Sequence, residues 1–198
     1  DTVSKIKVAC EEEAAKIRIE KQECQADLAA AQPYLDEADK AVNSINSNDK
    51  TIWFHCASLG EYEQGFPLFV EIKKKYPNHK LVLSFFSPSG YEVKKANSIA
   101  DIVVYLPIDT KDNCEKFLDL IKPEIVVFIK SEIWPNYLNE IKKRNIKSIL
   151  VCAIYNSSQM KYGLLKKAVL KFDYIFTQDE KSKDLFKSIG HNNVFNSG

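Results

Sequence analysis

The chain has 198 residues, of which 45% are hydrophobic and 28% are charged, so its composition is that of an ordinary globular protein. Its 28 basic and 27 acidic residues leave a net charge of +1, which excludes a global electrostatic attraction to nucleic acid. No apolar run reaches the roughly 18 residues that a bilayer span requires. The five cysteines are far apart and lack the spacing of zinc ligands, which favours buried thiols in a reduced, cytosolic chain over disulfides or a metal site.

Residues 1–45 carry the pattern of a coiled-coil helix. Apolar residues recur in alternating steps of three and four from Val3 to Ile45, interrupted only by Lys7 and Lys21, with charged and helix-favouring residues between them. One narrow apolar stripe cannot bury itself, so this helix is expected to need a partner helix. Pro33 removes one backbone donor and is expected to bend the helix.

This segment also resembles a known one, the outgoing helix of the dynein heavy-chain stalk. The resemblance rests on the sequence EEEAAKIRIEKQECQADLAAAQPYLDEADKAVNSI and covers only about residues 1–45. Neither a returning stalk helix nor an ATPase module follows, so motor function is not expected in this chain. We interpret the chain as a chimera or fusion, in which residues 46–50 form a polar linker.

From residue 51 onward, short apolar runs alternate with amphipathic segments. The apolar runs predict strands at residues 51–57, 80–86, 102–106, 125–129, 148–153, 174–177 and 194–196. Helices are predicted between them at residues 61–76, 90–97, 111–121, 135–144, 159–171 and 180–189. Continuous apolar strands joined by helical crossovers are typical of a mostly parallel sheet that is covered on both faces. The predicted fold of residues 51–198 is therefore α/β, a doubly wound, Rossmann-like domain whose ligands bind beyond the carboxyl ends of the strands.

The first junction between a strand and a helix is the stretch WFHCASLGEYE, in which an apolar run turns into acidic residues. Ser58 can cap the following helix, and Gly60 lets the backbone approach a ligand closely. Glu61 falls in the first helical turn, where the helix dipole favours an ionised carboxylate. From the residues alone, Glu61 is either a capping carboxylate that only stabilises the helix or a functional group at the sheet edge.

Three further junctions carry polar residues. In the turn SPSG, the amides near Ser89 and Gly90 could hold an anion or a sugar hydroxyl, although an ordinary turn explains them as well. In LPIDT, Asp109 or Thr110 is expected to cap the next helix. In KSEIWPN, Glu132 ends a buried strand and must find a partner or solvent, which favours a functional role.

In order and spacing, the stretches IWFHCASLGE, SPSG, LPID and SEIWPN resemble the amino-terminal domain of the transferases of 3-deoxy-D-manno-octulosonic acid (Kdo). The resemblance covers about residues 46–198. It implies one half of a two-domain (GT-B) glycosyltransferase that transfers Kdo from CMP-Kdo to a lipid A precursor in lipopolysaccharide biosynthesis. It also implies that no metal or cofactor is needed beyond this donor substrate.

The resemblance assigns roles to particular residues. Glu61 takes the position of the general base, and Glu132 is a second carboxylate of the cleft. Ser58, Gly60, Ser89 and Gly90 would line the acceptor groove. A lipid acceptor implies a membrane-facing surface, for which the predicted helix at residues 159–171 is a candidate, with Lys166 and Lys167 binding acceptor phosphates; a surface helix packed on the sheet is the plainer alternative.

The resemblance also predicts the setting of the protein and its limits. The expected location is the cytoplasmic face of the bacterial inner membrane. The carboxy-terminal donor domain is missing, so we expect the chain alone to be catalytically inactive. Phe66 replaces an arginine common in the family, and residues 152–154 replace an N-A-R stretch, which puts donor or phosphate contacts in doubt. The alternative function is a coiled-coil interaction module that carries the α/β domain passively. A dinucleotide or P-loop site is disfavoured because the sequence has neither GxGxxG after the first strand nor a Walker motif.

Overall fold

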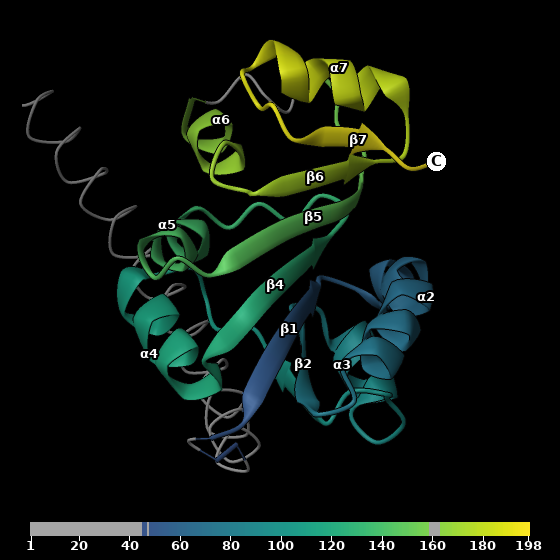
Figure 1. Ribbon diagram of the computed structural model, residues 1–198, viewed down its shortest axis with the longest axis vertical. Coiled ribbons are helices and arrows are strands. Elements are labelled where there is room, and N and C mark those ends of the chain that lie inside the picture. Colours follow the sequence, from purple (N-terminus) through teal and green to yellow (C-terminus); the bar gives the residue numbers. More distant parts are fainter. Residues whose placement is uncertain (1–44, 47, 159–162) are drawn as a thin grey trace, which may run out of the picture. The chain divides into compact units, whose positions relative to one another are not determined.

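The computed structural model describes residues 45–46, 48–158 and 163–198 (Figure 1). All of them belong to one of the two compact units of the chain, Ala38–Gly198. The coiled-coil helix expected at residues 1–45, its resemblance to a dynein stalk and its need for a partner helix lie outside the described residues, apart from Ile45. They therefore stay predictions.

The described residues form a parallel sheet with helices between its strands. The strands are β1 (Lys50–Cys56), β2 (His79–Phe85), β3 (Ile102–Tyr105), β4 (Pro123–Ile129), β5 (Lys147–Ala153), β6 (Tyr174–Thr177) and β7 (Val194–Asn196). The helices are α2 (Leu59–Lys75), α3 (Pro88–Lys94), α4 (Lys111–Ile121), α5 (Pro135–Lys143), α6 (Gly163–Val169) and α7 (Glu180–Ser188). All neighbouring strands pair in parallel, in the order β3-β2-β1-β4-β5-β6-β7. The predicted doubly wound, Rossmann-like α/β fold is confirmed.

The predicted element boundaries agree closely with this structure. Strands β6 and β7 and helix α4 coincide with their predicted residues, and most other ends differ by one to three residues. Helix α2 begins at Leu59, two residues earlier than expected, because Ser58 already has the extended conformation of an N-cap (φ −141°, ψ 169°). Of the helix predicted at residues 159–171, residues 159–162 lie outside the described part, and the helix there spans Gly163–Val169.

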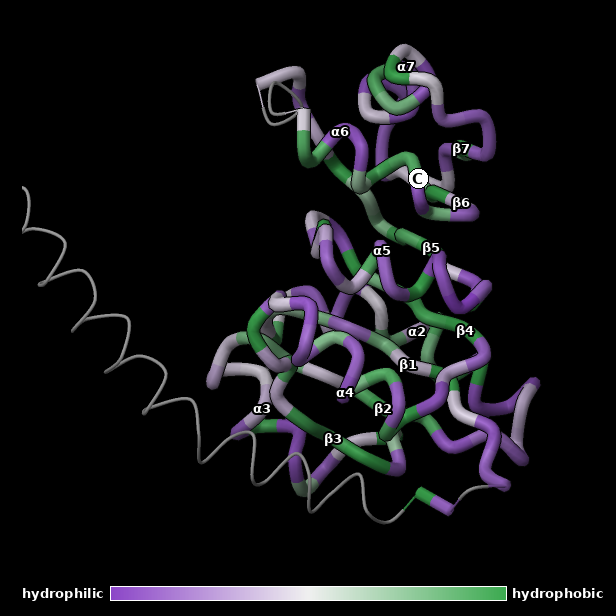
Figure 2. Tube along the Cα trace, turned by 90° about the vertical axis from the view of Figure 1, so that its left-hand side faces the viewer, coloured by the Kyte–Doolittle hydropathy of each residue, from purple (hydrophilic) through white to green (hydrophobic). Residues whose placement is uncertain are grey.

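Helices cover both faces of the sheet, and apolar residues are concentrated on the strands between them (Figures 1 and 2). On one face, α2 and α3 pack on a cluster that includes Phe54, Phe69 and Phe85. On the other, α4 to α7 share a second cluster, in which the ring of Trp53 lies 5.2 Å from that of Phe117. Two hydrophobic layers therefore hold the central strands from opposite sides, as expected for strands with few polar residues.

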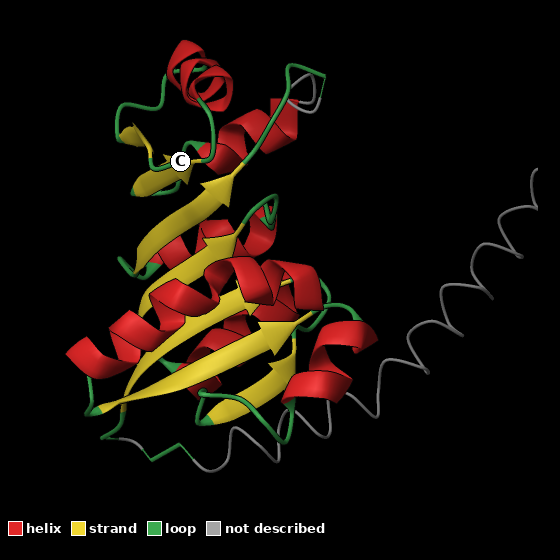
Figure 3. Ribbon diagram, turned by 90° about the vertical axis from the view of Figure 1, so that its right-hand side faces the viewer, coloured by secondary structure: helices red, strands yellow, loops and turns green. Residues whose placement is uncertain are grey.

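The strand order places one break in direction between β1 and β4. From β1 the chain first adds β2 and β3 on one side and then returns to add β4 and the later strands on the other. The strands run the same way, so their carboxyl ends share one edge (Figure 3). In open α/β sheets, ligands bind at this edge, beside the point where the strand order reverses. The residues that follow β1 and β4 are therefore the first candidates for a site.

Helix α2 lies close to the sheet because it carries a glycine at the contact. A Cβ atom on Gly65 would lie 2.7 Å from the ring of Phe69 and 2.9 Å from Cδ1 of Ile129. This contact fixes the amino-terminal turn of α2 near the carboxyl end of β4. None of the described helices is long and apolar enough to cross a bilayer. Cys56, Cys114 and Cys152 are free thiols.

Candidate active site

Two carboxylates lie near each other at the break in strand order. Glu61 lies in the first turn of α2, directly after β1, and Glu132 lies in the turn that follows β4. Because β1 and β4 are hydrogen-bonded neighbours, these two junctions are adjacent. Glu61 is only 9% exposed, and the side chain of Glu132 is 13% exposed. The structure therefore brings together the two acidic residues to which the sequence analysis assigned catalytic and acceptor-binding roles.

The Glu61 carboxylate closes back on the loop that precedes its helix. Its Oε2 accepts a hydrogen bond from the backbone amide of Ala57 at 2.5 Å. Ser58 occupies the N-cap position, but its side chain makes no capping hydrogen bond. The expectation that the Ser58 hydroxyl caps α2 is therefore wrong. Glu61, the third residue of the helix, instead reaches back to the amide of Ala57, which lies before the N-cap. Ser58 remains beside Glu61 at the mouth of this turn.

Glu132 is anchored by two nitrogen atoms at one of its oxygens. The indole nitrogen of Trp134 donates to Oε2 at 2.7 Å, and Nε2 of His55 lies 3.2 Å from the same oxygen. The half-buried carboxylate thus finds the partners that its position at the end of a buried strand requires. Trp134 is itself the N-cap residue of α5, so the start of that helix fixes the place of Glu132.

His55 is supported from the core by polar residues that the sequence analysis did not single out. His55 and Ser84 are register partners on β1 and β2, and Nδ1 of His55 lies 2.9 Å from Oγ of Ser84. The indole nitrogen of Trp53 donates to the same Ser84 oxygen at 2.7 Å. All three side chains are fully buried. The sequence contains one signal for this contact, since His55 and Ser84 are polar residues near the carboxyl ends of their strands. Predicting that the two residues are neighbours requires the strand register.

The electrostatics of the site favour proton uptake by Glu61. Burial is the main cause that raises the pKa of Glu61, and the nearby charge of Glu132 raises it further. The backbone amide of Ala57 and the charge of Lys130 offset part of this increase. A carboxylate with a raised pKa is a better general base near neutral pH than an ordinary surface carboxylate. Glu61 therefore has the chemistry of a proton acceptor.

Backbone strain accompanies the site. Lys130 (φ 67°) and Cys152 (φ 53°), at the carboxyl ends of β4 and β5, adopt the left-handed conformation without being glycine. Such strain is often concentrated at functional sites. Tyr155, which follows β5, is buried, and burial together with the charges of Glu132 and Glu61 raises the pKa of its hydroxyl.

Ser89 and Gly90 lie at the next junction, at the start of α3, where the contacts are mainly structural. The hydroxyl of Ser87 accepts a hydrogen bond from the amide of Ser89 at 3.3 Å, which caps the helix. A Cβ atom on Gly90 would lie 2.2 Å from the ring of Phe85, so packing alone requires glycine there. Gly60 differs, because the nearest atom to its Cβ position is Oγ of Ser58 at 4.0 Å. Of the two predicted glycines, Gly60 leaves space for a ligand.

The loop after β3 has the structural role that its sequence indicated, with one change. Thr110 caps α4 through a hydrogen bond from the amide of Asn113 at 3.3 Å. Asp109 caps a different helix, α5, by accepting from the amides of Asn136 at 3.1 Å and Tyr137 at 3.0 Å. A carboxylate between β3 and α4 thus holds the helix start that carries Trp134.

Lys166 and Lys167 are exposed on α6, which lies on the other face of the sheet from α2 and Glu61. Helix α6 packs on the cluster that it shares with α4 and α5, whereas α2, which carries Glu61, packs on the opposite face of the sheet. No hydrogen bond or ion pair within the described ranges links either lysine to the carboxylates. If they bind acceptor phosphates, they do so apart from Glu61.

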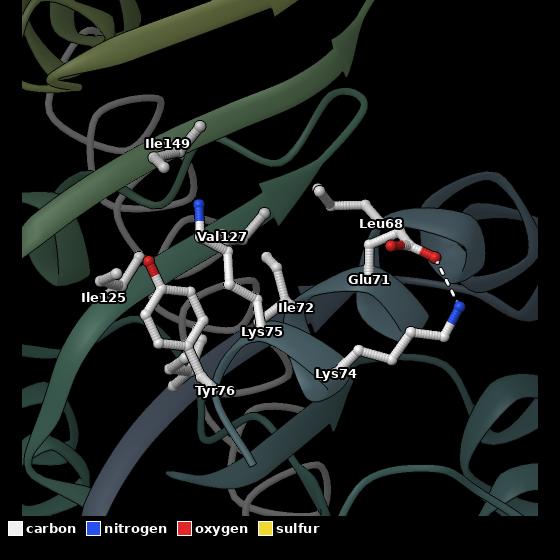
Figure 4. A pocket seen from close by; sticks show the side chains of 10 residues that line it. Leu68, Glu71, Ile72, Lys74, Lys75, Tyr76, Ile125, Val127 and Ile149 are labelled. Atoms are coloured by element: carbon white, nitrogen blue, oxygen red, sulfur yellow. Dashed lines mark hydrogen bonds and ion pairs between the residues drawn. The ribbon is translucent and has the colours of Figure 1, made fainter. Parts of the chain in front are cut away.

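A hollow of about 570 Å³ lies near the amino ends of the strands (Figure 4). Ile72 and Tyr76, from the carboxyl end of α2, line it together with Ile125, Val127 and Ile149. This hollow is mostly apolar and lies at the edge of the sheet opposite to Glu61 and Glu132, so it is separate from the candidate site. No group of three or more His, Cys, Asp or Glu residues in the described part could hold a metal ion.

A doubly wound parallel sheet with paired carboxylates at its switch point defines a Rossmann-like domain with a candidate sugar or nucleotide site. Two solved structures share this fold. A putative UDP-N-acetylglucosamine 2-epimerase from Listeria monocytogenes has a TM-score of 0.55 at 10% identity, over 74% of this chain and 44% of that one. UDP-GlcNAc 2-epimerase from Neisseria meningitidis, bound to UDP-GlcNAc, has a TM-score of 0.54 at 15% identity, over 76% of this chain and 46% of that one.

The chain belongs to the 3-deoxy-D-manno-octulosonic-acid transferase (kdotransferase) family, whose model matches residues 31–198. A bifunctional glycosyltransferase/methyltransferase of Fusobacterium nucleatum is 33% identical over 181 residues, which cover 82% of this chain and 28% of that protein. A 3-deoxy-D-manno-octulosonic acid transferase of Aquifex aeolicus is 30% identical over 156 residues, which cover 78% of this chain and 41% of that protein. The resemblance of residues 46–198 to the Kdo transferases is confirmed, and the chain spans less than half the length of these relatives.

Proposed function

We propose that this chain is the acceptor-binding half of a glycosyltransferase that moves Kdo from CMP-Kdo to a lipid A precursor in lipopolysaccharide biosynthesis. The observation that carries the proposal is that Glu61 and Glu132 lie together where the strand order of the sheet reverses, in a chain of the Kdo transferase family. One buried carboxylate with a raised pKa and a second, anchored carboxylate beside it suit a reaction in which a hydroxyl must lose its proton.

In the proposed reaction, a hydroxyl oxygen of the acceptor attacks the anomeric carbon of Kdo. Its proton passes to the Glu61 carboxylate, and the bond between Kdo and CMP breaks, leaving its electron pair on the phosphate of CMP. Glu132 accepts a hydrogen bond from a sugar hydroxyl and orients it toward Glu61. Ser58 and Gly60, at the start of α2, line the acceptor groove, with Ser89 beyond them. Gly90, which also packs on the Phe85 ring, lines the groove beside Ser89.

We expect the donor to bind mainly to the part of such transferases that lies outside the matched region. Relatives that match this chain are more than twice as long as the matched part. We therefore expect no transfer when CMP-Kdo and lipid IVA are mixed with the 198-residue chain alone. Appreciable transfer by this chain would contradict the division of labour between two halves. The proposed location, at the cytoplasmic face of the inner membrane, follows from the lipid acceptor.

The proposal is tested in the longer protein by replacing the base without changing its shape. Glu61→Gln should lower kcat of Kdo transfer by roughly 100-fold or more, the usual contribution of general acid–base catalysis. Glu124→Gln is a matched control, because Glu124 is an exposed carboxylate on β4 that pairs with Lys50 at 3.2 Å. Equal turnover by the Glu61→Gln variant and wild type would return Glu61 to a purely structural role.

A further inference from the structure

Both tryptophans of the chain and one of its three histidines belong to a single chain of hydrogen bonds. It starts in the core, where Trp53 donates to Ser84, and continues from Ser84 to His55 and from His55 to Glu132. Trp134 reaches the same Glu132 oxygen from the other side. The proposed reaction uses only Glu132, the last residue of this series of hydrogen bonds. It does not explain the role of Trp53, Ser84 and His55, which are buried behind Glu132.

The numbers of donors and acceptors show which group donates in each of these hydrogen bonds. The Trp53 indole can only donate, so the Ser84 oxygen accepts from it and has one hydrogen of its own to give. Its two possible acceptors are Nδ1 of His55 at 2.9 Å and the carbonyl oxygen of Phe54 at 3.5 Å. The shorter contact favours Nδ1 as the acceptor. Nε2 of His55 then carries the hydrogen, as it must in order to bond an ionised carboxylate.

Packing fixes the His55 ring in this orientation. The ring centroid lies 5.5 Å from that of Trp134, at an interplanar angle of 83°, and 5.8 Å from that of Phe128, at 72°. The side chain has no exposed surface, and Phe86 covers Trp134 from outside at 5.1 Å. A ring that is enclosed in this way and bonded at both nitrogens cannot turn freely, and it reaches the site only through Glu132.

We propose that His55 is a positioning residue that holds Glu132 in place beside Glu61 through its Nε2–H group. Trp134 and His55 both bond Oε2, and no group in the described part of the chain donates to Oε1. Oε1 is therefore left for a substrate hydroxyl. This last step rests on the proposed function, whereas the anchoring of Glu132 does not.

Glu61 can report on the anchoring, because its titration depends on the groups around it. The facing groups are Glu132 and Lys130 from the turn after β4, the Cys56 thiol at the end of β1, and Tyr155 after β5. Among these, Glu132 is the charge that raises the pKa of Glu61, after burial. A Glu132 side chain that lost its anchor would spend more time in solvent, so its effect on Glu61 would weaken.

The first test needs no substitution at the site. Long-range ¹H–¹⁵N correlation spectra of the ¹⁵N-labelled 198-residue chain show which ring nitrogen of each histidine carries a hydrogen. His79→Gln and His191→Gln variants assign the other two histidines. We expect Nε2 of His55 to be protonated at pH 7, and an Nδ1–H tautomer with a bare Nε2 would overturn the proposal.

The second test follows the Glu61 carboxyl carbon by ¹³C NMR during a pH titration of the same chain. His55→Leu should shift the Glu61 midpoint downward, in the same direction as Glu132→Gln, whereas His55→Gln, which keeps a donor, should stay near wild type. An unchanged midpoint in a folded His55→Leu chain would overturn the proposal. If His55→Leu does not fold, the proposal is decided by two other results: the tautomer of His55 in the wild-type chain, and the titration midpoint of Glu61 in the His55→Gln variant. Neither test involves Kdo or lipid, so a failed transferase proposal would leave both results standing.

Discussion

Asp109 Oδ1 accepts a hydrogen bond of 3.0 Å from the backbone amide of Tyr137, so a carboxylate that follows β3 caps the distant helix α5. The same helix start carries Trp134, whose indole holds Glu132 at 2.7 Å. The cap therefore contributes both to the stability of the domain and to the geometry of the candidate site.

Asp109→Ala should lower the free energy of unfolding by about 1–2 kcal/mol, the usual effect of losing a helix cap. Urea unfolding followed by far-UV circular dichroism measures this change. Asp112→Ala, at an exposed position in the first turn of α4, is the control and should change it far less. Equal effects of the two substitutions would show that Asp109 does not act as a cap.

The raised pKa of Glu61 gives stability a definite dependence on pH. Between the ordinary pKa of glutamate and the raised value, the native state holds more protons than the unfolded state, so stability falls as pH rises through this window. Glu61→Gln removes this loss. The variant should therefore be more stable than wild type above the window, and the difference should disappear as pH falls below it, as measured by urea unfolding at a series of pH values.

Glu124 provides a control of opposite sign. Hydrogen bonds from His79 and Lys50 lower the pKa of this exposed carboxylate, so its contribution to stability is present at neutral pH and is lost in acid. Glu124→Gln should therefore be less stable than wild type at neutral pH, and the difference should disappear in acid. The same sign for both variants would contradict the electrostatic account of Glu61.

The two glycines of the predicted groove should behave differently when alanine replaces them. Gly90→Ala forces a methyl group against the Phe85 ring and should cost about 1–3 kcal/mol of unfolding free energy. Gly60→Ala meets open space and should leave stability unchanged or raise it by up to about 1 kcal/mol. If the acceptor binds against Gly60, the Gly60→Ala variant should bind lipid IVA more weakly than wild type, even though its stability is not reduced. A binding titration followed by tryptophan fluorescence measures this change.

Lys130 combines backbone strain with a charge near Glu61. Lys130→Gly should raise the free energy of unfolding by about 1 kcal/mol, because glycine adopts its φ of 67° without strain. The same substitution removes a positive charge that lowers the pKa of Glu61, so this pKa should rise further. Lys122→Gly, at the carboxyl end of α4 with φ 43°, should relieve strain alone. Carboxyl ¹³C titrations of both variants separate the two effects.

Lys166 and Lys167 offer a test of the acceptor surface. If these lysines bind acceptor phosphates, the double charge reversal Lys166→Glu and Lys167→Glu should weaken lipid IVA binding by the 198-residue chain at least tenfold. The double reversal Lys111→Glu and Lys116→Glu, at two exposed positions on α4, changes the net charge equally and is the control. Equal binding by both variants would remove α6 from the acceptor site.

Much of the fold could be predicted because the strands are nearly continuous apolar runs. The run before Ala57 and the run before Lys130 ended close to the observed strand ends, so Glu61 and Glu132 were placed at the sheet edge correctly. Parallel topology then brings such junctions together. The sequence therefore predicts that Glu61 and Glu132 lie at the same edge of the sheet. The strand order that makes them neighbours comes from the structure.

Features that depend on register or on side-chain reach could not be predicted. The Ser84–His55 contact exists because β1 and β2 align these two positions, which hydrophobic periodicity does not specify. The missing Ser58 cap depends on the local side-chain conformation, which the sequence pattern does not specify. The packing requirement at Gly90 could not be predicted either, because no sequence pattern reveals the Phe85 ring behind it.

The pairing of β1 with β4 also sets when the site can form. His55 and Glu132 are 77 positions apart in the chain. Contacts of such long range form slowly, because closing the long loop between the two residues costs conformational entropy. On a ribosome, Glu61 would emerge well before the segment that carries Glu132. The candidate site is therefore absent from every early folding intermediate that lacks β4.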